Sequence, residues 1–308
     1  MKLTLDQIKS VTVGALRIYE DEQGIRFQKC TEKQVAAWYA RARILGERAE
    51  TTTGVRLDFH TDSKTVVVEA GSDDKYEVHI NDLLRYRLLC SEGEKMSIDL
   101  GEGEKRVTLV LPSHKAGVIR SVELEDGASL APHTYARRIL FIGDSITQGW
   151  NSDYDSLSYA WQVTKFFDAE SVIQGVGGGY FHESTVDTID FDADTVVIAY
   201  GTNDYSHYKT LEDLRTQADR FFAGIGAQFA GKKRLAVTPI YREDMNKDKA
   251  MGSFAQCRAT VAEMAEKHGF TVVDGLTLVP HSMDFMADAL HPNAMGFAQY
   301  ALHLVKYL

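Results

Sequence analysis

The sequence is poor in cysteine and has fewer basic than acidic residues. Its 308 residues include three cysteines, Cys30, Cys90 and Cys257, and an odd number of widely separated cysteines favours buried free thiols over a disulfide framework. Lys and Arg number 34 against 44 Asp and Glu, which gives a net charge of −10. Because affinity for nucleic acid depends mostly on cations that meet phosphate, this balance argues against a nucleic-acid partner.

Long apolar runs are also missing. No run approaches the length that a membrane-spanning helix needs, so we expect no membrane partner. The first residues lack the apolar core of a signal peptide. Together with the unpaired cysteines, these features predict a protein of the reducing cytoplasm.

Motifs for cofactors and metals are incomplete. The glycine-rich stretch 171–180 resembles a dinucleotide fingerprint, but Tyr180 stands in place of the final glycine. The stretch 226–233 resembles a phosphate-binding loop, but Lys233 replaces the required Ser or Thr. No Cys or His cluster has the spacing of a zinc site. We therefore predict no cofactor and no metal.

The two halves of the chain have different patterns. Residues 1–130 are rich in short segments that alternate apolar and polar residues between turn signals, which is typical of antiparallel strands. The clearest of these segments are residues 55–60, 65–69, 76–80 and 106–111. The pattern predicts an N-terminal β-sandwich or jelly-roll domain, with residues 36–42 as a short helix or covering segment.

Residues 135–308 alternate strands with helices. Predicted strands are 139–142, 171–174, 195–200, 234–239 and 271–273, and predicted helices lie near 158–168, 211–228, 251–268 and 294–307. This alternation indicates a mostly parallel sheet with helices on both faces. Residues 127–133 are the expected linker, and because they carry no charge run we expect the two domains to pack together.

The first candidate for chemistry is Ser145. An apolar strand ends in Gly143-Asp144-Ser145, and glycines allow a sharp turn at its carboxyl end. Ligands of open α/β sheets bind outside the carboxyl ends of the strands. A hydroxyl group there is a candidate nucleophile, and the alternative is an ordinary loop serine.

Two later segments could support a nucleophile at the same edge. Asn203 follows the strand 195–200, and its amide could stabilise an oxyanion without carrying charge, although Gly-Thr-Asn-Asp is also good turn chemistry. His291 could act as a base, with Asp288 close enough to reach its other ring nitrogen. The alternative for His291 is a surface histidine with a local carboxylate partner.

The glycine-rich bend after residue 174 could supply a backbone N–H as a second oxyanion donor. Gly178 is the expected donor, with Gly177 and Gly179 as alternatives and a turn without catalytic function as the competing interpretation. The aromatic residues Trp150, Tyr180 and Tyr205 are near these loops in sequence, and we expect them to line a substrate cleft.

Taken together, residues 143–147, the glycine bend, residues 201–204 and the Asp288–Pro292 block resemble the SGNH (GDSL) hydrolases, in the order that the family has them. The resemblance implies a flavodoxin-like three-layer α/β/α fold and ester hydrolysis through an acyl-enzyme. It implies that Ser145 is the nucleophile, His291 the base and Asp288 the acid that orients it. The implied oxyanion hole consists of the Ser145 N–H, a glycine N–H near 178 and the Asn203 side chain. The family usually has Asn before the glycine, whereas this chain has Gln174.

The β-rich N-terminal half carries a second resemblance. A jelly-roll domain ahead of such a catalytic domain is similar to the acetyl-xylan esterases of carbohydrate esterase family 2. The predicted function is therefore deacetylation of acetylated oligosaccharides, without a cofactor. Two alternatives stay open: a short-chain lipase or thioesterase that acts on a non-sugar ester, and a non-catalytic carbohydrate-binding protein on the same fold.

Overall fold

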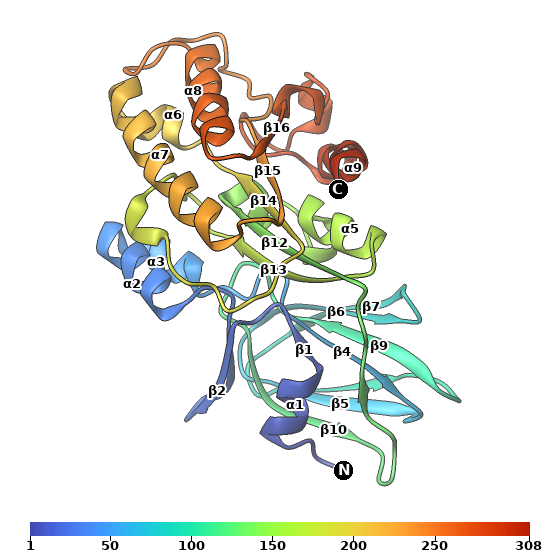
Figure 1. The fold of residues 1–308 in the computed structure, drawn as a ribbon. Coiled ribbons are helices and arrows are strands. Elements are labelled where there is room, and N and C mark those ends of the chain that lie inside the picture. Colours follow the sequence, from blue (N-terminus) through green and yellow to red (C-terminus); the bar gives the residue numbers. More distant parts are fainter.

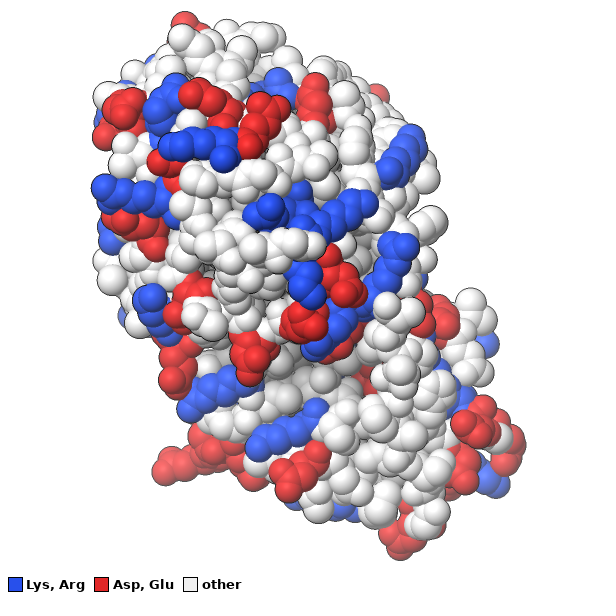
Figure 2. Space-filling view, viewed as in Figure 1, with Lys and Arg blue, Asp and Glu red and all other residues white.

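A computed structural model describes all residues 1–308. Figure 1 shows an antiparallel β half, which contains the N-terminus, beneath an α/β half, which contains the C-terminus. No helix combines the length and apolar character that crossing a membrane requires. On the face shown in Figure 2, acidic and basic side chains lie beside one another over both halves.

The antiparallel half contains two sheets. One sheet has the order β1 (Thr12–Val13), β4 (Arg56–Thr61), β9 (Lys105–Val110), β6 (Asp74–Ile80) and β7 (Leu83–Cys90), with β11 (Ala131–Pro132) paired to β4. The other has the order β2 (Arg17–Asp21), β3 (Gly24–Gln28), β10 (Val118–Leu124), β5 (Thr65–Ala70) and β8 (Lys95–Asp99). All four strands predicted in this half are present. Their alternation has the expected cause, since Val66, Val68 and Ala70 of β5 are buried in one core of 23 residues that both sheets share.

Three helices accompany these sheets: α1 (Leu5–Val11), α2 (Glu32–Arg41) and α3 (Arg43–Ala49). The short helix expected at residues 36–42 is confirmed as the greater part of α2, which begins at a capping box formed by Thr31 and Gln34. Trp38 of α2 and Leu45 of α3 are buried in the core of the α/β half rather than in the core of the antiparallel sheets. Figure 1 shows both helices beside the α/β half.

The α/β half is built on a five-stranded parallel sheet, and every strand predicted for it is present. Its order is β13 (Ala169–Gly175), β12 (Arg137–Gly143), β14 (Thr195–Ala199), β15 (Lys233–Val237) and β16 (Thr271–Val273). This is the 2-1-3-4-5 order of flavodoxin. Because the strands are parallel, their carboxyl ends meet at one edge of the sheet, which we call the rim.

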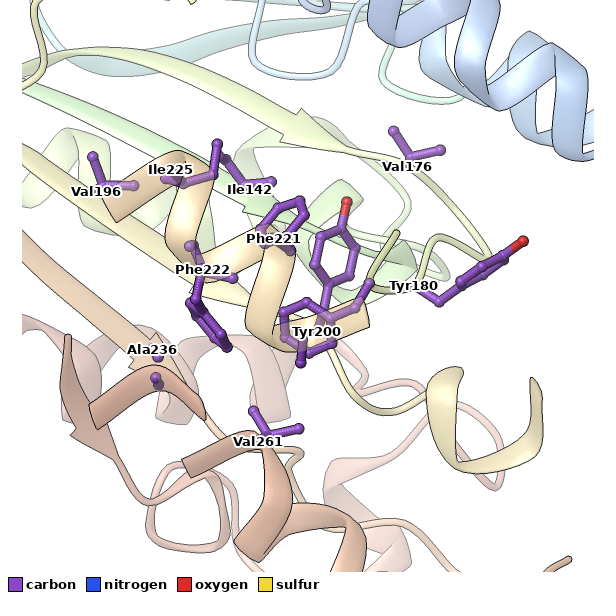
Figure 3. Packing of buried hydrophobic residues seen from close by; sticks show 14 of the residues in the cluster. Ile142, Val176, Tyr180, Val196, Tyr200, Phe221, Phe222, Ile225, Ala236 and Val261 are labelled. Carbon is purple, nitrogen blue, oxygen red and sulfur yellow. The ribbon is translucent and has the colours of Figure 1, made fainter. Parts of the chain in front are cut away.

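Helices cover both faces of this sheet. They are α4 (Ser145–Gln148), α5 (Tyr159–Phe166), α6 (Asp204–His207), α7 (Leu211–Gln228), α8 (Phe254–Lys267) and α9 (Ala294–Leu304). Leu140 and Ile142 of β12 pack in a core with α7, α8, α2 and α3, and Figure 3 shows Phe221 and Phe222 of α7 in that core. Ile139 and Phe141 pack in the opposite core with α5 and α9. Successive side chains of β12 thus enter cores on opposite faces of the sheet, which explains why this central strand is apolar along its length.

The two halves meet along a contact that we call the seam, and much of it is buried and polar. Arg56 of β4 donates to the carbonyl of Ala169 at 2.9 Å, and the N–H of Gly54 donates to Asp155 at 2.8 Å. Glu77 of β6 accepts from the hydroxyl group of Ser156 at 2.6 Å. The expected linker, residues 127–133, contributes β11 to the first sheet and so is not free along its whole length.

Candidate active site

Ser145 lies in a tight turn between β12 and α4. Asp144 caps α4 by accepting the N–H of Ile146 at 2.9 Å. Gly143 is required for close approach, because a Cβ atom there would lie 2.1 Å from Oγ1 of Thr147 and 2.7 Å from the carbonyl oxygen of Ala199. The turn therefore places Ser145, which is 5% exposed, at the rim.

Ser145, His291 and Asp288 form one hydrogen-bonded row. The Oγ atom of Ser145 lies 2.9 Å from Nε2 of His291, and Nδ1 of His291 lies 2.9 Å from Oδ2 of Asp288. A carboxylate at Nδ1 places the ring proton there, so Nε2 is the nitrogen that can accept the proton of the serine hydroxyl group. The structure thus brings together the three residues that the sequence proposed.

The carboxylate of Asp288 is held mainly by its own loop. It accepts the backbone N–H groups of Leu290 at 2.8 Å and of His291 at 2.7 Å. Partial burial raises the pKa of Asp288, but hydrogen bonds from His291 and Leu290 outweigh it and keep that pKa below its usual range. Asp288 is therefore an anion at neutral pH and can stabilise a protonated His291.

Asn151 also holds Asp288, and the sequence did not indicate it. Its Nδ2 atom donates to Oδ2 of Asp288 at 2.7 Å across 137 residues of chain. Asn151 has a φ of +67°, in the left-handed region that asparagine tolerates better than most residues, and it follows the left-handed Gly149 that ends α4. The loop after the serine helix thereby reaches the loop that carries the histidine.

In the glycine bend after β13, one N–H remains without an acceptor. Gly177 donates to Oε1 of Gln148 at 2.7 Å, and Gly179 donates to the carbonyl of Val176 at 2.8 Å. The N–H of Gly178 forms no hydrogen bond, and the residue has a φ of +79°. Of the three glycines that the sequence left open, Gly178 is thus the one whose donor is free for a ligand.

Asn203 is attached to this bend. Its Nδ2 atom donates to the carbonyl of Gly179 at 2.9 Å, and a primary amide has a second N–H that this bond leaves free. Asp204 holds the two loops together by accepting from Gly201 at 2.9 Å and from Phe181 at 3.0 Å. Burial raises the pKa of Asp204 to about 7. The structure therefore places Asn203 and the glycine bend side by side at the rim.

The comparison with protein families agrees with this geometry. The model of the GDSL-like lipase/acylhydrolase family matches residues 141–299, which is more than half of the chain. The chain belongs to the GDSL-like lipase/acylhydrolase family. It is accordingly an enzyme of the ester-hydrolase class. No curated protein matches the sequence.

Solved structures share the fold of this GDSL-like acylhydrolase over nearly its whole length. The salicylyl-acyltransferase SsfX3 from a tetracycline biosynthetic pathway has a TM-score of 0.83 at 20% identity, covering 94% of this chain and 91% of that one. A family two carbohydrate esterase from Cellvibrio japonicus has a TM-score of 0.71 at 15% identity, covering 100% and 97%. The acetyl xylan esterase Est2A from the rumen bacterium Butyrivibrio proteoclasticus has a TM-score of 0.68 at 14% identity, covering 100% and 98%. The likeness thus extends to the antiparallel half, which lies outside the family match.

The aromatic residues expected to line a cleft in this GDSL-like enzyme are mostly engaged elsewhere. The prediction that Tyr205 lines the cleft is wrong, because Tyr205 is fully buried against Phe254 and its hydroxyl group donates to the carbonyl of Lys247. Tyr180 is also buried and stacks on His207 with ring centroids 3.8 Å apart, so packing accounts for it. Only Trp150 stays half-buried.

Trp150 is flanked by residues from the N-terminal half. The guanidinium carbon of Arg48 lies 4.7 Å from the Trp150 ring centroid, and the ring of His114 meets Trp150 edge to face at 5.3 Å. Neither Arg48 nor His114 had any signal in the sequence, because both lie outside the segments with a recognisable strand, helix or motif pattern. No group of three or more His, Cys, Asp or Glu side chains is arranged to hold a metal ion.

Proposed function

We propose that this protein is a serine esterase that deacetylates acetylated oligosaccharides through a Ser145–His291–Asp288 triad. The observation that carries the proposal is the unbroken row of hydrogen bonds from the Ser145 hydroxyl group through His291 to Asp288, with both contacts at 2.9 Å. A serine hydroxyl group becomes a nucleophile when an oriented base removes its proton.

The proposed reaction has two stages. Oγ of Ser145 bonds to the acyl carbon while Nε2 of His291 takes its proton, and Asp288 stabilises the resulting imidazolium. The N–H groups of Ser145 and Gly178 and the side chain of Asn203 hold the negatively charged oxygen. His291 returns the proton to the sugar oxygen as the sugar leaves. Water then attacks the acyl-enzyme by the same steps, which releases acetate and restores Ser145.

Replacement of the nucleophile tests this proposal. Ser145→Ala is expected to lower kcat on 4-nitrophenyl acetate by a factor of about 10⁴–10⁶, with an unchanged melting temperature. Ser152→Ala is the matched control, since Ser152 belongs to the following loop and its hydroxyl group donates only to backbone carbonyls. Hydrolysis by Ser145→Ala at the parent rate would refute the triad.

The carbohydrate substrate is supported by the family two carbohydrate esterases among the structural neighbours. The two antiparallel sheets fit the proposal of a jelly-roll accessory domain, residues 1–130, ahead of a catalytic domain, residues 135–308. The three cysteines are free and buried, which fits our proposal of a cytoplasmic enzyme that acts on oligosaccharides.

Acyl length and acetate release decide between this substrate and a non-sugar ester. 4-nitrophenyl esters from acetate to octanoate are expected to show the highest kcat/KM for acetate, and acetylated oligosaccharides are expected to release acetate. A preference beyond butyrate would favour the lipase alternative. A fluorophosphonate that labels the parent but not Ser145→Ala would exclude a non-catalytic binding protein.

A second candidate function is acyl transfer to an alcohol. It is favoured by the likeness to SsfX3, which has a TM-score of 0.83 and covers 94% of this chain. In that case a sugar or phenol hydroxyl group would replace water as the acceptor for the acyl-enzyme. Adding alcohols during turnover of 4-nitrophenyl acetate distinguishes the two, because a transferase would form the new ester in preference to free acetate.

A further inference from the structure

The glycine bend contains a peptide group that has two possible orientations. The hydrogen bond from Gly179 to Val176 at 2.8 Å closes a β-turn over residues 176–179, and the φ of +79° at Gly178 makes it type II. A type I turn connects the same ends with the central peptide group, here the one between Gly177 and Gly178, turned over. Because both central residues are glycines, the backbone itself enforces neither form.

The orientation of this peptide decides whether the oxyanion donor exists. In a trans peptide the C=O of Gly177 and the N–H of Gly178 point in opposite directions. Turning the peptide over would remove the free N–H of Gly178 from its present side and put the carbonyl oxygen of Gly177 there instead. A carbonyl oxygen would repel an oxyanion that the N–H would otherwise stabilise.

Arg48 contacts this peptide on the side opposite its N–H. Its Nη1 atom donates to the carbonyl of Gly177 at 3.0 Å, across 129 residues of chain. That hydrogen bond is possible only in the observed orientation. A Cβ atom added at Gly177 would lie 3.0 Å from Cδ of Arg48, and one at Gly178 would lie 3.2 Å from Nη1, so the guanidinium group packs directly on the bend.

The surroundings of Arg48 keep it in place. Its guanidinium group lies over the ring of Trp150, and its backbone carbonyl accepts from the buried amine of Lys29 at 3.0 Å. Arg48 forms no ion pair, whereas Arg43 on the same helix is exposed and pairs with Glu47 at 2.7 Å. The side chain of Arg48 thus donates its hydrogen bond to the glycine bend and none to a carboxylate.

We infer that Arg48 is a positioning residue that locks the Gly177–Gly178 peptide with its N–H available to the reacting ester. The N-terminal region thereby completes the oxyanion hole of the α/β half. This inference rests on the proposed function, since it assigns a role within the same site. The Arg48 side chain forms no hydrogen bond with Ser145, His291 or Asp288, and it acts through the orientation of Gly178.

Kinetics and a transition-state analogue test the inference. Arg48→Met is expected to lower kcat on 4-nitrophenyl acetate by about 10–100-fold, less than the loss of a whole donor, with KM within about twofold. An alkylboronic acid, which forms a tetrahedral anion on Ser145, should bind more weakly by the same factor. Arg48→Lys keeps a donor and is expected to recover most of the rate. Arg43→Met is the matched control and should behave as the parent in every assay.

A crystal structure of Arg48→Met gives a readout that does not depend on activity. The expected result is a turned-over or mixed Gly177–Gly178 peptide, with a negative φ at Gly178 in part of the molecules. A single unchanged orientation would overturn the inference, as would a fall in kcat with unchanged boronic acid affinity. If the parent shows no esterase activity, or activity that Ser145→Ala does not abolish, the proposed function fails. The orientation of the Gly177–Gly178 peptide in Arg48→Met would still test whether Arg48 fixes that peptide.

Discussion

The rim and the seam use polar residues in opposite ways. At the rim, the N–H of Gly178 has no partner in the protein, and the hydroxyl group of Ser145 is bonded to the base His291. At the seam, polar groups bind one another, as when the guanidinium of Arg106 donates to both oxygens of Asp58 at 2.8 Å and, across the two halves, to Asp168 at 2.8 Å. Polar groups at the rim are thus arranged toward a ligand, whereas those at the seam are mostly satisfied by other protein groups, with Oδ1 of Asp155 as a buried exception.

Two carboxyl groups within the seam make the contrast sharper. Burial raises the pKa of Asp58, but the hydrogen bonds from Arg106 and the charges of Arg56 and Arg106 reverse this and lower it to about 2. Asp155 is also buried but has no such bond from a guanidinium group, so burial raises its pKa to about 7. Burial acts on both groups and both have cations nearby, so the direct hydrogen bonds from Arg106 to Asp58 decide the difference.

The largest effect on stability is expected at Asp58. Asp58→Ala leaves Arg56 and Arg106 buried without their shared anion, which costs about 3–5 kcal/mol of unfolding free energy. Urea denaturation measures the loss, and kcat of the folded fraction should stay near that of the parent. Glu102→Ala is the matched control, because Glu102 pairs with Lys64 on the surface and such pairs contribute about 0–1 kcal/mol. Equal losses in the two variants would remove the distinction between buried and exposed pairs.

A smaller, pH-dependent effect is expected at Asp155. Its folded pKa of about 7 is above the unfolded value, so the folded state binds a proton that the unfolded state has released between about pH 4 and 7. The contribution of Asp155 is fully present below pH 4 and is lost as the pH rises through 7. Asp155→Asn abolishes this loss, so its Tm should exceed that of the parent by about 5 °C at pH 8, by less at pH 5, and match it near pH 4.

Asp153→Asn is the control for this titration, since its side chain is 84% exposed two residues earlier. The difference in Tm between Asp153→Asn and the parent should not change with pH. A Tm difference for Asp155→Asn that is the same at pH 5 and pH 8 would show that Asp155 is ionised in the folded protein at both.

The rim was far more predictable from sequence than the seam. The strand β12 and the residues Ser145, Asn203 and His291 stand in short blocks whose local pattern fixes both structure and position. Tyr205 misled the prediction because nearness in sequence to a rim loop does not say which side of α6 faces the core. The edge strand β7 was missed because its exposed leucines break the alternation of apolar and polar residues.

Contacts between distant segments were beyond sequence reasoning for a physical reason. Arg48 reaches Gly177 only because α3 packs on the α/β half, and Asn151 reaches Asp288 only because two loops meet at the rim. A single side chain, whether on a helix such as α3 or in a loop, leaves no period, cap or spacing from which such a partner could be predicted. Arg48 and Asn151, which hold other residues of the site in place, could therefore not be predicted from the sequence.

The smallest effect is expected at Asn151, whose amide joins the rim loops. Asn151→Gly removes the hydrogen bond to Asp288 while tolerating the φ of +67°, so stability should change little. Because Asp288 is 44% exposed, water can replace the amide, and kcat/KM should fall by only about three- to tenfold.

Asn151→Asp distinguishes orientation from charge at the same position. It keeps a residue that tolerates the left-handed conformation but adds a negative charge beside Asp288, which favours the protonated form of the neighbouring imidazole. The acidic limb of the kcat/KM profile should therefore move to higher pH in Asn151→Asp and stay in place in Asn151→Gly. If neither variant changes the rate or the profile, Asn151 is a surface contact, and the rim is organised by the Asp288 loop and the Arg48 contact alone.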